Sequence, residues 1–235
     1  MTLRPDEIKQ GYLSEMDAMV ELLRGIDETG WATASRCEGW TVADVAAHAV
    51  GSSADVAAGR LEGLGSPEVT AREVAERKGK TATELADELA SLREPLSNLM
   101  SLFDEEAWQS QAPGGYDGTL AQGVEALLYD TWAHSDDIRA ALGEPSATGI
   151  GLRSAVHHLA LTLGQQGWGP ATLALDGVEE VAVAAPVDDA PGPGSKSGPG
   201  SDGRITGDAL TFVLAASGRI DPEPLGLDST VNVYR

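Results

Sequence analysis

The sequence predicts an α+β protein, with an N-terminal four-helix bundle followed by a smaller C-terminal α+β domain. Two observations lead to this prediction. Residues 1–147 carry apolar side chains at three- and four-residue steps, which is typical of amphipathic helices. In residues 148–235, one more helical stretch gives way to short β-rich runs and a Gly/Pro/Ser-rich segment. We therefore place the domain boundary between residues 147 and 148.

The first two helices are marked by their start signals as well as their periodicity. Pro5 lies near the first turn of the first helix, where proline is favoured. The apolar stripe that follows consists of Ile8, Tyr12, Met16, Met19, Leu23 and Ile26. The second helix is expected to begin at Thr41, a suitable N-cap, and Asp44 three residues later nearly completes a capping box.

The third and fourth helices complete the predicted bundle. The third runs through residues 81–103, and Pro95 is expected either to kink it or to split it. The fourth begins near Thr119, after the turn-rich "APGGYDG", and ends at Gly143 with Pro145 beyond it. Four long helices with one apolar face each favour a four-helix bundle.

The C-terminal region mixes helix and strand. Residues 151–167 have a helical pattern, and residues 171–186 show two β-rich runs around Asp176-Gly177, which indicates a hairpin. Residues 188–203, rich in Gly, Pro and Ser, are expected to form a mobile loop or a long β-connection. A further helix is expected in residues 207–219. The closing "STVNVYR" is interpreted as a strand.

Charge and composition exclude several classes of function. The chain has 37 acidic and 16 basic side chains, a formal net charge of −21, so it should repel nucleic acids and anionic membranes. A single cysteine, Cys37, rules out an intramolecular disulfide and a Cys-rich zinc module. Because no His is near it in sequence, Cys37 is interpreted as a structural thiol rather than a nucleophile.

The predicted location is the cytoplasm. The N-terminal "MTLRPDEIKQGYLSEMD" lacks the apolar core of a signal peptide. The sequence also has no uninterrupted apolar run of about 18 residues, which a membrane span would need. We expect small-molecule partners and no membrane or nucleic-acid partner, and the protein to be either a monomer or a homodimer.

Three side chains on the predicted helices suggest a metal site. Asp130 and His134 are four residues apart, so they point the same way from neighbouring turns of one helix. His48 lies on the otherwise apolar face "VADVAAHAV" and is expected to be buried. Two His and one carboxylate projecting into a bundle would form a half-open site for Zn²⁺, Fe²⁺ or Ni²⁺.

The residues alone leave a simpler interpretation open. A single inward-facing His is more often a hydrogen-bonded core residue than a ligand, and an Asp–His pair at this spacing is more often a surface pair. Spacing along the chain does not join His48 to the other two. The pattern of residues therefore suggests the triad without establishing it.

Three motifs, taken together, resemble a known family. They are "SRCEGWTVADVAAHAV" at the start of the second helix, "DTWAHSDDIRAALG" at the end of the fourth, and the Gly-Arg of "FVLAASGRIDPEPLGLD". In this order they resemble the mycothiol-dependent maleylpyruvate isomerase family, a branch of the DinB/YfiT-like metalloenzymes. The resemblance spans most of the chain and implies a DinB-like metal-binding bundle followed by that family's C-terminal domain.

The resemblance implies roles for individual residues. His48, Asp130 and His134 fall on the family's metal ligands, although the usual carboxylate there is Glu, one methylene longer than Asp130. Asp137 matches a trailing Asp that could orient His134, or it could be an ordinary solvated Asp. Trp132, between two ligands, could line the cofactor-binding pocket or simply pack. Arg219, if it reaches a cleft between the domains, could hold a substrate carboxylate, or it could cap a helix end.

The resemblance further implies a chemistry. A divalent metal, Zn²⁺ by preference with Ni²⁺ or Fe²⁺ as alternatives, would hold the sulfur of a low-molecular-weight thiol, mycothiol, as a thiolate. The thiolate would attack a small electrophile, and the enzyme would be an isomerase or an S-transferase. Two other classes remain open: a metal-dependent hydrolase on the same scaffold, and a non-catalytic metal-binding or regulatory protein.

Overall fold

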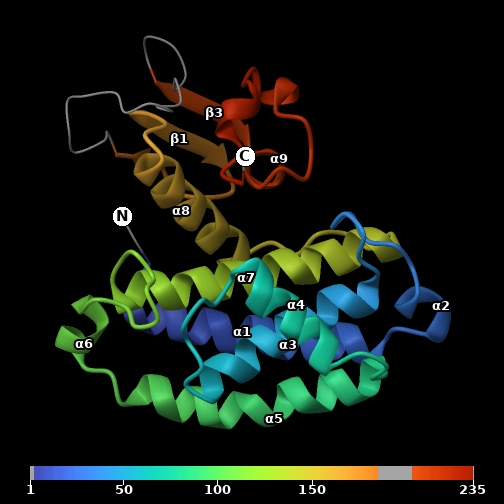
Figure 1. Cartoon of the computed structure of the whole chain (residues 1–235). Helices are drawn as coiled ribbons and strands as arrows, with labels where there is room; N and C mark the ends of the chain where they lie inside the picture. Colours follow the sequence, from blue (N-terminus) through green and yellow to red (C-terminus); the bar gives the residue numbers. More distant parts are fainter. Residues whose placement is uncertain (1–2, 185–202, 235) are drawn as a thin grey trace. The chain divides into compact units, whose positions relative to one another are not determined.

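The computed structural model describes residues 3–184 and 203–234 (Figure 1). The chain divides into two compact units. One is Arg4–Ala147, and the other contains Thr148–Arg235. Most of the predicted Gly/Pro/Ser-rich segment, residues 188–202, lies outside the described residues.

Four long helices form the core of the first unit. They are α1 (Pro5–Arg24), α3 (Val42–Ala57), α5 (Ala82–Ser101) and α7 (Leu120–Leu142). Helices α1 and α3 each pack against both α5 and α7 (Figure 1). This arrangement confirms the predicted bundle, in which each helix buries one apolar face against two neighbours.

The predicted helix ends agree with the structure. Thr41 Oγ1 accepts a hydrogen bond from the Asp44 backbone N–H, and the Asp44 carboxylate accepts one from the Thr41 N–H, so the capping box is complete. Thr119 caps α7 in the same way. Gly143 ends α7 with a φ of 73°, a left-handed conformation that favours glycine.

Helix α5 is one continuous helix with Pro95 inside it, so the proline does not split it. Pro95 lies on the exposed side of the helix. The missing N–H therefore removes a hydrogen bond from a carbonyl that water can reach, which limits the destabilisation.

The predicted apolar stripe on α1 is buried. Ile8, Tyr12, Met16, Met19 and Leu23 are each at most 1% exposed, whereas Ile26, beyond the end of the helix, is half-buried. Burying such side chains in a close-packed interior is the main favourable term in bundle stability.

Three short helices in the first unit were not predicted. They are α2 (Glu28–Trp31), α4 (Pro67–Glu76) and α6 (Glu105–Gln109). Helix α4 packs against α3. Its start carries ordinary signals, because Ser66 caps the Val69 N–H and Pro67 occupies the first turn.

The second unit combines α8 (Ile150–Gln165) and α9 (Ala209–Ala216) with a three-stranded sheet. Strands β1 (Ala171–Asp176) and β2 (Val181–Val183) pair antiparallel, which confirms the predicted hairpin. Strand β3 (Arg204–Asp208) was not predicted; it pairs parallel to β1 and gives the order β2-β1-β3. These elements confirm the α+β fold class.

The closing strand predicted in "STVNVYR" is wrong. Residues Ser229–Val231 form a 3-10 helix, preceded by another at Glu223–Leu225. The Asp228 carboxylate accepts hydrogen bonds from the backbone N–H and the hydroxyl of Thr230, which favours a turn over an extended chain. Within residues 3–184 and 203–234, no helix is long and apolar enough to span a membrane.

A buried carboxyl group on α7 makes the stability of the bundle depend on pH. Glu125 is 2% exposed, and burial raises its pKa to about 7. Unfolded chains ionise glutamate near its ordinary value of about 4.3. Ionisation therefore favours the unfolded state, and the stabilisation present at low pH is lost as the pH rises through 7.

We predict that Glu125→Gln stabilises the protein by about 3 kcal/mol at pH near 8, because the amide cannot ionise. At a pH of about 4 both side chains are neutral and the two proteins should unfold alike. Chemical denaturation at both pH values measures this, with the exposed Glu62→Gln as the matched control. An equal effect at the two pH values would contradict the prediction.

Candidate metal centre

His48, Asp130 and His134 lie together in the structure. His48 comes from α3, and Asp130 and His134 come from successive turns of α7. Each offers one ligand atom, and the three atoms lie within 4.8 Å of one another. The rings of His48 and His134 meet edge to face with their centroids 4.9 Å apart. The packing of α3 against α7 thus joins residues that spacing along the chain could not join.

Each imidazole is held through its Nδ1 by a carboxylate outside the triad. His48 Nδ1 lies 2.7 Å from Glu73 Oε2, and His134 Nδ1 lies 3.1 Å from Asp137 Oδ2. An ionised carboxylate only accepts hydrogen bonds, so Nδ1 carries the proton in both rings. In a neutral ring this leaves Nε2 with a free lone pair. His134 Nε2 lies 3.4 Å from Asp130 Oδ1.

Asp137 joins α7 to the loop before α3. Its carboxylate is fully buried and accepts hydrogen bonds from Arg36 Nε at 2.6 Å and from Cys37 Sγ at 3.2 Å, besides the one from His134. Arg36 also pairs with the buried Asp136. The guanidinium therefore supplies the positive charge that two buried carboxylates need.

Cys37, His134 and Asp137 form a second group of potential ligand atoms within 4.8 Å of one another. Two of its members are already engaged, since Asp137 pairs with Arg36 and His134 Nδ1 bonds Asp137. The half-buried Cys37 donates to Asp137, and its interpretation as a structural thiol stays a prediction. We therefore interpret Cys37 and Asp137 as residues that orient His134, not as a second metal site.

The charges around His134 favour its protonated form when no metal is bound. Burial alone lowers the pKa of this imidazole, but the nearby Asp130 charge and the hydrogen bonds to Asp130 and Asp137 outweigh it, so the pKa lies well above its usual range. Burial also raises the pKa of Tyr12 to about 12, with a smaller contribution from the Asp130 charge. The site thus attracts positive charge.

One tryptophan, Trp40, contacts the group, and a second, Trp132, lies between two of its members in the sequence. Trp40 is half-buried, and its ring contacts the His48 ring with centroids 5.6 Å apart. Trp132 is buried, and its indole N–H donates to the Ala147 carbonyl at 3.2 Å. Its predicted contact with a thiol cofactor stays a prediction.

Arg219 belongs to the second unit, where it follows the end of α9 and is half-buried. Its backbone N–H donates to the Leu214 carbonyl at 2.7 Å. The predicted contact of its guanidinium with a substrate carboxylate also stays a prediction.

Two supporting residues were not predicted from the sequence: Glu73, which contacts His48, and Arg36, which pairs with Asp136 and Asp137. Glu73 lies on the unpredicted α4. The start signals at Ser66 and Pro67 could have revealed this helix, but nothing in its sequence indicates contact with His48. Arg36 lies within a quoted motif, yet its partners are about 100 residues away in the chain.

Comparisons with known proteins match the chain to one family. The family model described as the mycothiol maleylpyruvate isomerase N-terminal domain matches residues 12–139. A comparison with curated proteins finds no match.

Two solved structures share the fold over most of both chains. One is a crystal structure of a mycothiol-dependent maleylpyruvate isomerase, with a TM-score of 0.60 and 20% sequence identity. The other is a histidine-to-alanine mutant of such an isomerase, with a TM-score of 0.61 and 19% identity. In both cases the match covers 94% of this chain and 92% of the other.

The contacts of Arg36 lead to a stability prediction. Arg36→Met would leave the buried Asp136 and Asp137 without their guanidinium, and should lower the free energy of unfolding by about 3 kcal/mol. Arg93→Met is the control, since Arg93 pairs with Asp17 on the exposed surface and should contribute less than about 1 kcal/mol. Urea denaturation compares the two variants; equal destabilisation would show that burial of the Arg36 pairs is unimportant.

Proposed function

The chain belongs to the mycothiol maleylpyruvate isomerase family, and from this premise we propose that it is a metal- and thiol-dependent enzyme, an isomerase or S-transferase acting on a small electrophile. The observation that carries the proposal is the convergence of His48, Asp130 and His134, whose ligand atoms lie within 4.8 Å of one another. Each imidazole also has its Nδ1 engaged by a carboxylate outside the triad.

The geometry fits a divalent cation. Zinc ligands at bond lengths of about 2.0–2.1 Å in a tetrahedron lie roughly 3.3 Å apart, close to the 3.4 Å between His134 Nε2 and Asp130 Oδ1. The Asp130 carboxylate therefore lies close enough to His134 Nε2 for both to bind one cation, although Asp is one methylene shorter than the family's usual Glu. Three protein ligands leave at least one position for a further ligand, as in catalytic zinc sites. Two imidazoles and one carboxylate suit Zn²⁺, with Ni²⁺ or Fe²⁺ as alternatives.

The proposed chemistry begins with a thiol. A bound divalent cation would supply the Lewis acidity that keeps a thiol sulfur deprotonated near neutral pH. His48, Asp130 and His134 would hold the cation, and Asp137 would orient His134 through Nδ1. We propose mycothiol as the thiol because of the family. Arg219 is proposed to bind a carboxylate of the substrate.

The two proposed reactions differ in their last step. In an isomerase, the thiolate adds to a carbon of a conjugated cis double bond and the electron pair moves into the conjugated acceptor. The resulting single bond rotates, and expulsion of the thiolate restores the double bond in the trans form. In an S-transferase, the adduct takes up a proton in place of expelling the thiol, and the thioether is released.

Metal content tests the ligand set. Purified protein should contain about one divalent metal ion per chain, and His48→Ala should lose most of it because two protein ligands remain. Elemental analysis by mass spectrometry measures the ratio. His158→Ala is the control, since His158 lies in the second unit. If His48→Ala keeps the wild-type metal content, the ligand assignment is wrong.

A thiol assay tests the reaction. Incubation with mycothiol and a conjugated cis-enone acid should give either an isomerised product or a thiol adduct, both detectable by mass spectrometry. Asp130→Asn should lower turnover at least about tenfold, because the amide is a weaker metal ligand. Turnover that does not depend on thiol would favour a metal-dependent hydrolase. A metal-bound protein with no turnover on any such acceptor would favour a binding role.

A further inference from the structure

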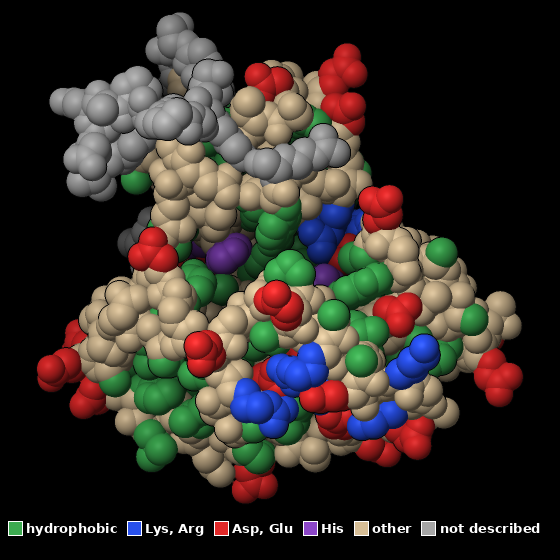
Figure 2. All heavy atoms as spheres, in the orientation of Figure 1, with side chains coloured by type: hydrophobic (Ala, Val, Ile, Leu, Met, Phe, Trp, Pro, Cys, Tyr) green, Lys and Arg blue, Asp and Glu red, His purple; other side chains and the backbone are tan. Residues whose placement is uncertain are grey.

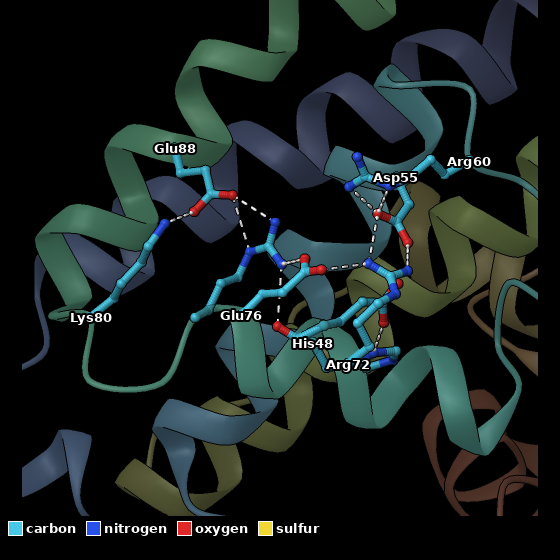
Figure 3. A network of polar contacts seen from close by, with 9 residues as sticks. His48, Asp55, Arg60, Arg72, Glu76, Lys80 and Glu88 are labelled. Atoms are coloured by element: carbon cyan, nitrogen blue, oxygen red, sulfur yellow. Dashed lines mark hydrogen bonds and ion pairs between the residues drawn. The ribbon is translucent and has the colours of Figure 1, made fainter.

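Ion pairs before and after Glu73 in the sequence hold α4 and the turn that follows it against the bundle. Figure 3 shows Arg72 reaching Asp55 on α3 and Lys80 reaching Glu88 on α5. Arg77, just after α4, also binds Glu88, with Nη2 2.7 Å from Oε1. Figure 2 shows basic side chains gathered among acidic ones on the face of the bundle that carries α4. These contacts fix where Glu73 lies.

Burying the Glu73 carboxylate between α4 and α3 costs free energy. Its side chain is fully buried, and Oε2 lies 2.7 Å from His48 Nδ1. Oε1 has no hydrogen-bond partner within residues 3–184 and 203–234. A buried carboxylate with an unsatisfied oxygen destabilises a fold, and an apolar side chain of similar size would usually be more stable. Its presence is therefore not explained by packing.

Gly51 permits the close approach that brings Glu73 to His48. A Cβ atom built on Gly51 would lie 2.5 Å from Glu73 Cβ and 2.8 Å from Glu73 Cγ, too close for non-bonded carbon atoms. Gly51 follows His48 by three residues on α3, so both share one side of that helix. The missing side chain of Gly51 thus leaves the space in which the Glu73 carboxylate reaches His48.

We propose that Glu73 is a positioning residue for His48. Its carboxylate holds the Nδ1 proton, fixes the ring orientation and leaves the Nε2 lone pair for the cation, as carboxylates behind metal-bound histidines do. The proposal rests on the proposed function, because it assigns Glu73 a part in the same metal site. It makes the site symmetric: Glu73 supports His48 as Asp137 supports His134.

The tautomer of His48 in metal-free protein tests this directly. At a pH of about 8.5 an ordinary imidazole is neutral, and a long-range ¹H–¹⁵N NMR spectrum reports which nitrogen carries the proton. The chain has four histidines, so the spectrum can be assigned with His48→Ala. Wild-type His48 should be protonated at Nδ1. Glu73→Leu should move the proton to Nε2, whereas Glu76→Leu, one turn further along α4, should leave it at Nδ1.

Zinc affinity gives the second measurement. With Zn²⁺ alone and a competing chelator, Glu73→Leu should bind about 10- to 100-fold more weakly than wild type, and Glu76→Leu should bind like wild type. A purely structural role for Glu73 would change thermal unfolding but neither the tautomer nor the affinity. Wild-type tautomer and affinity in Glu73→Leu would overturn the proposal.

Two further outcomes are distinguishable. If wild type binds none of Zn²⁺, Ni²⁺ and Fe²⁺, the proposed function fails, and the tautomer experiment still decides whether Glu73 holds His48. If Glu73→Leu does not fold, Gly51→Ala replaces it, because the added methyl group pushes Glu73 away without removing a polar group. Gly51→Ala should show the same proton shift and the same loss of affinity, and unchanged values would overturn the proposal.

Discussion

The structure depends on one electrostatic constraint: an ionised carboxylate buried inside a helical bundle destabilises the fold unless a positive charge or a hydrogen-bond donor lies beside it. Asp137 meets this constraint with Arg36, Cys37 and His134, and Asp55 meets it with Arg60 and Arg72. Such pairs contribute little net stability, because desolvation offsets most of the attraction. They nevertheless fix geometry, since removing one partner leaves a buried charge. The positions of α4 and of the loop before α3 follow from this requirement.

The same constraint explains why the candidate metal centre looks as it does. Asp130 and Asp137 raise the pKa of His134, which means that their charge favours a cation next to this ring. A proton satisfies that demand in metal-free protein, and a divalent ion would satisfy it better by replacing the proton. The same buried carboxylates thus favour a proton on His134 in metal-free protein and a metal ion beside His134 when one is bound. The metal site requires α3 and α7 to pack together, because His48 lies on α3 and the other two ligands lie on α7.

Local signals in the sequence were enough for the bundle, since amphipathic stripes and caps such as Thr41 and Thr119 are properties of short segments. The Asp130–His134 pair was equally visible, because one helix sets its spacing. His48 could be joined to that pair only through family resemblance, as its distance from them is set by packing. Glu73 and β3 were missed because their partners are distant in sequence, and the strand expected at the C-terminus was wrong because Asp228 favours a turn.

The metal ligands are tested most directly by a crystal structure of the metal-loaded protein, with anomalous diffraction recorded at the absorption edge of the metal. We predict one metal ion bound by His48 Nε2, His134 Nε2 and a carboxylate oxygen of Asp130, with both Nδ1 atoms still bonded to Glu73 and Asp137. A metal ion bound instead by Cys37 and Asp137, or through Nδ1 of either histidine, would contradict it.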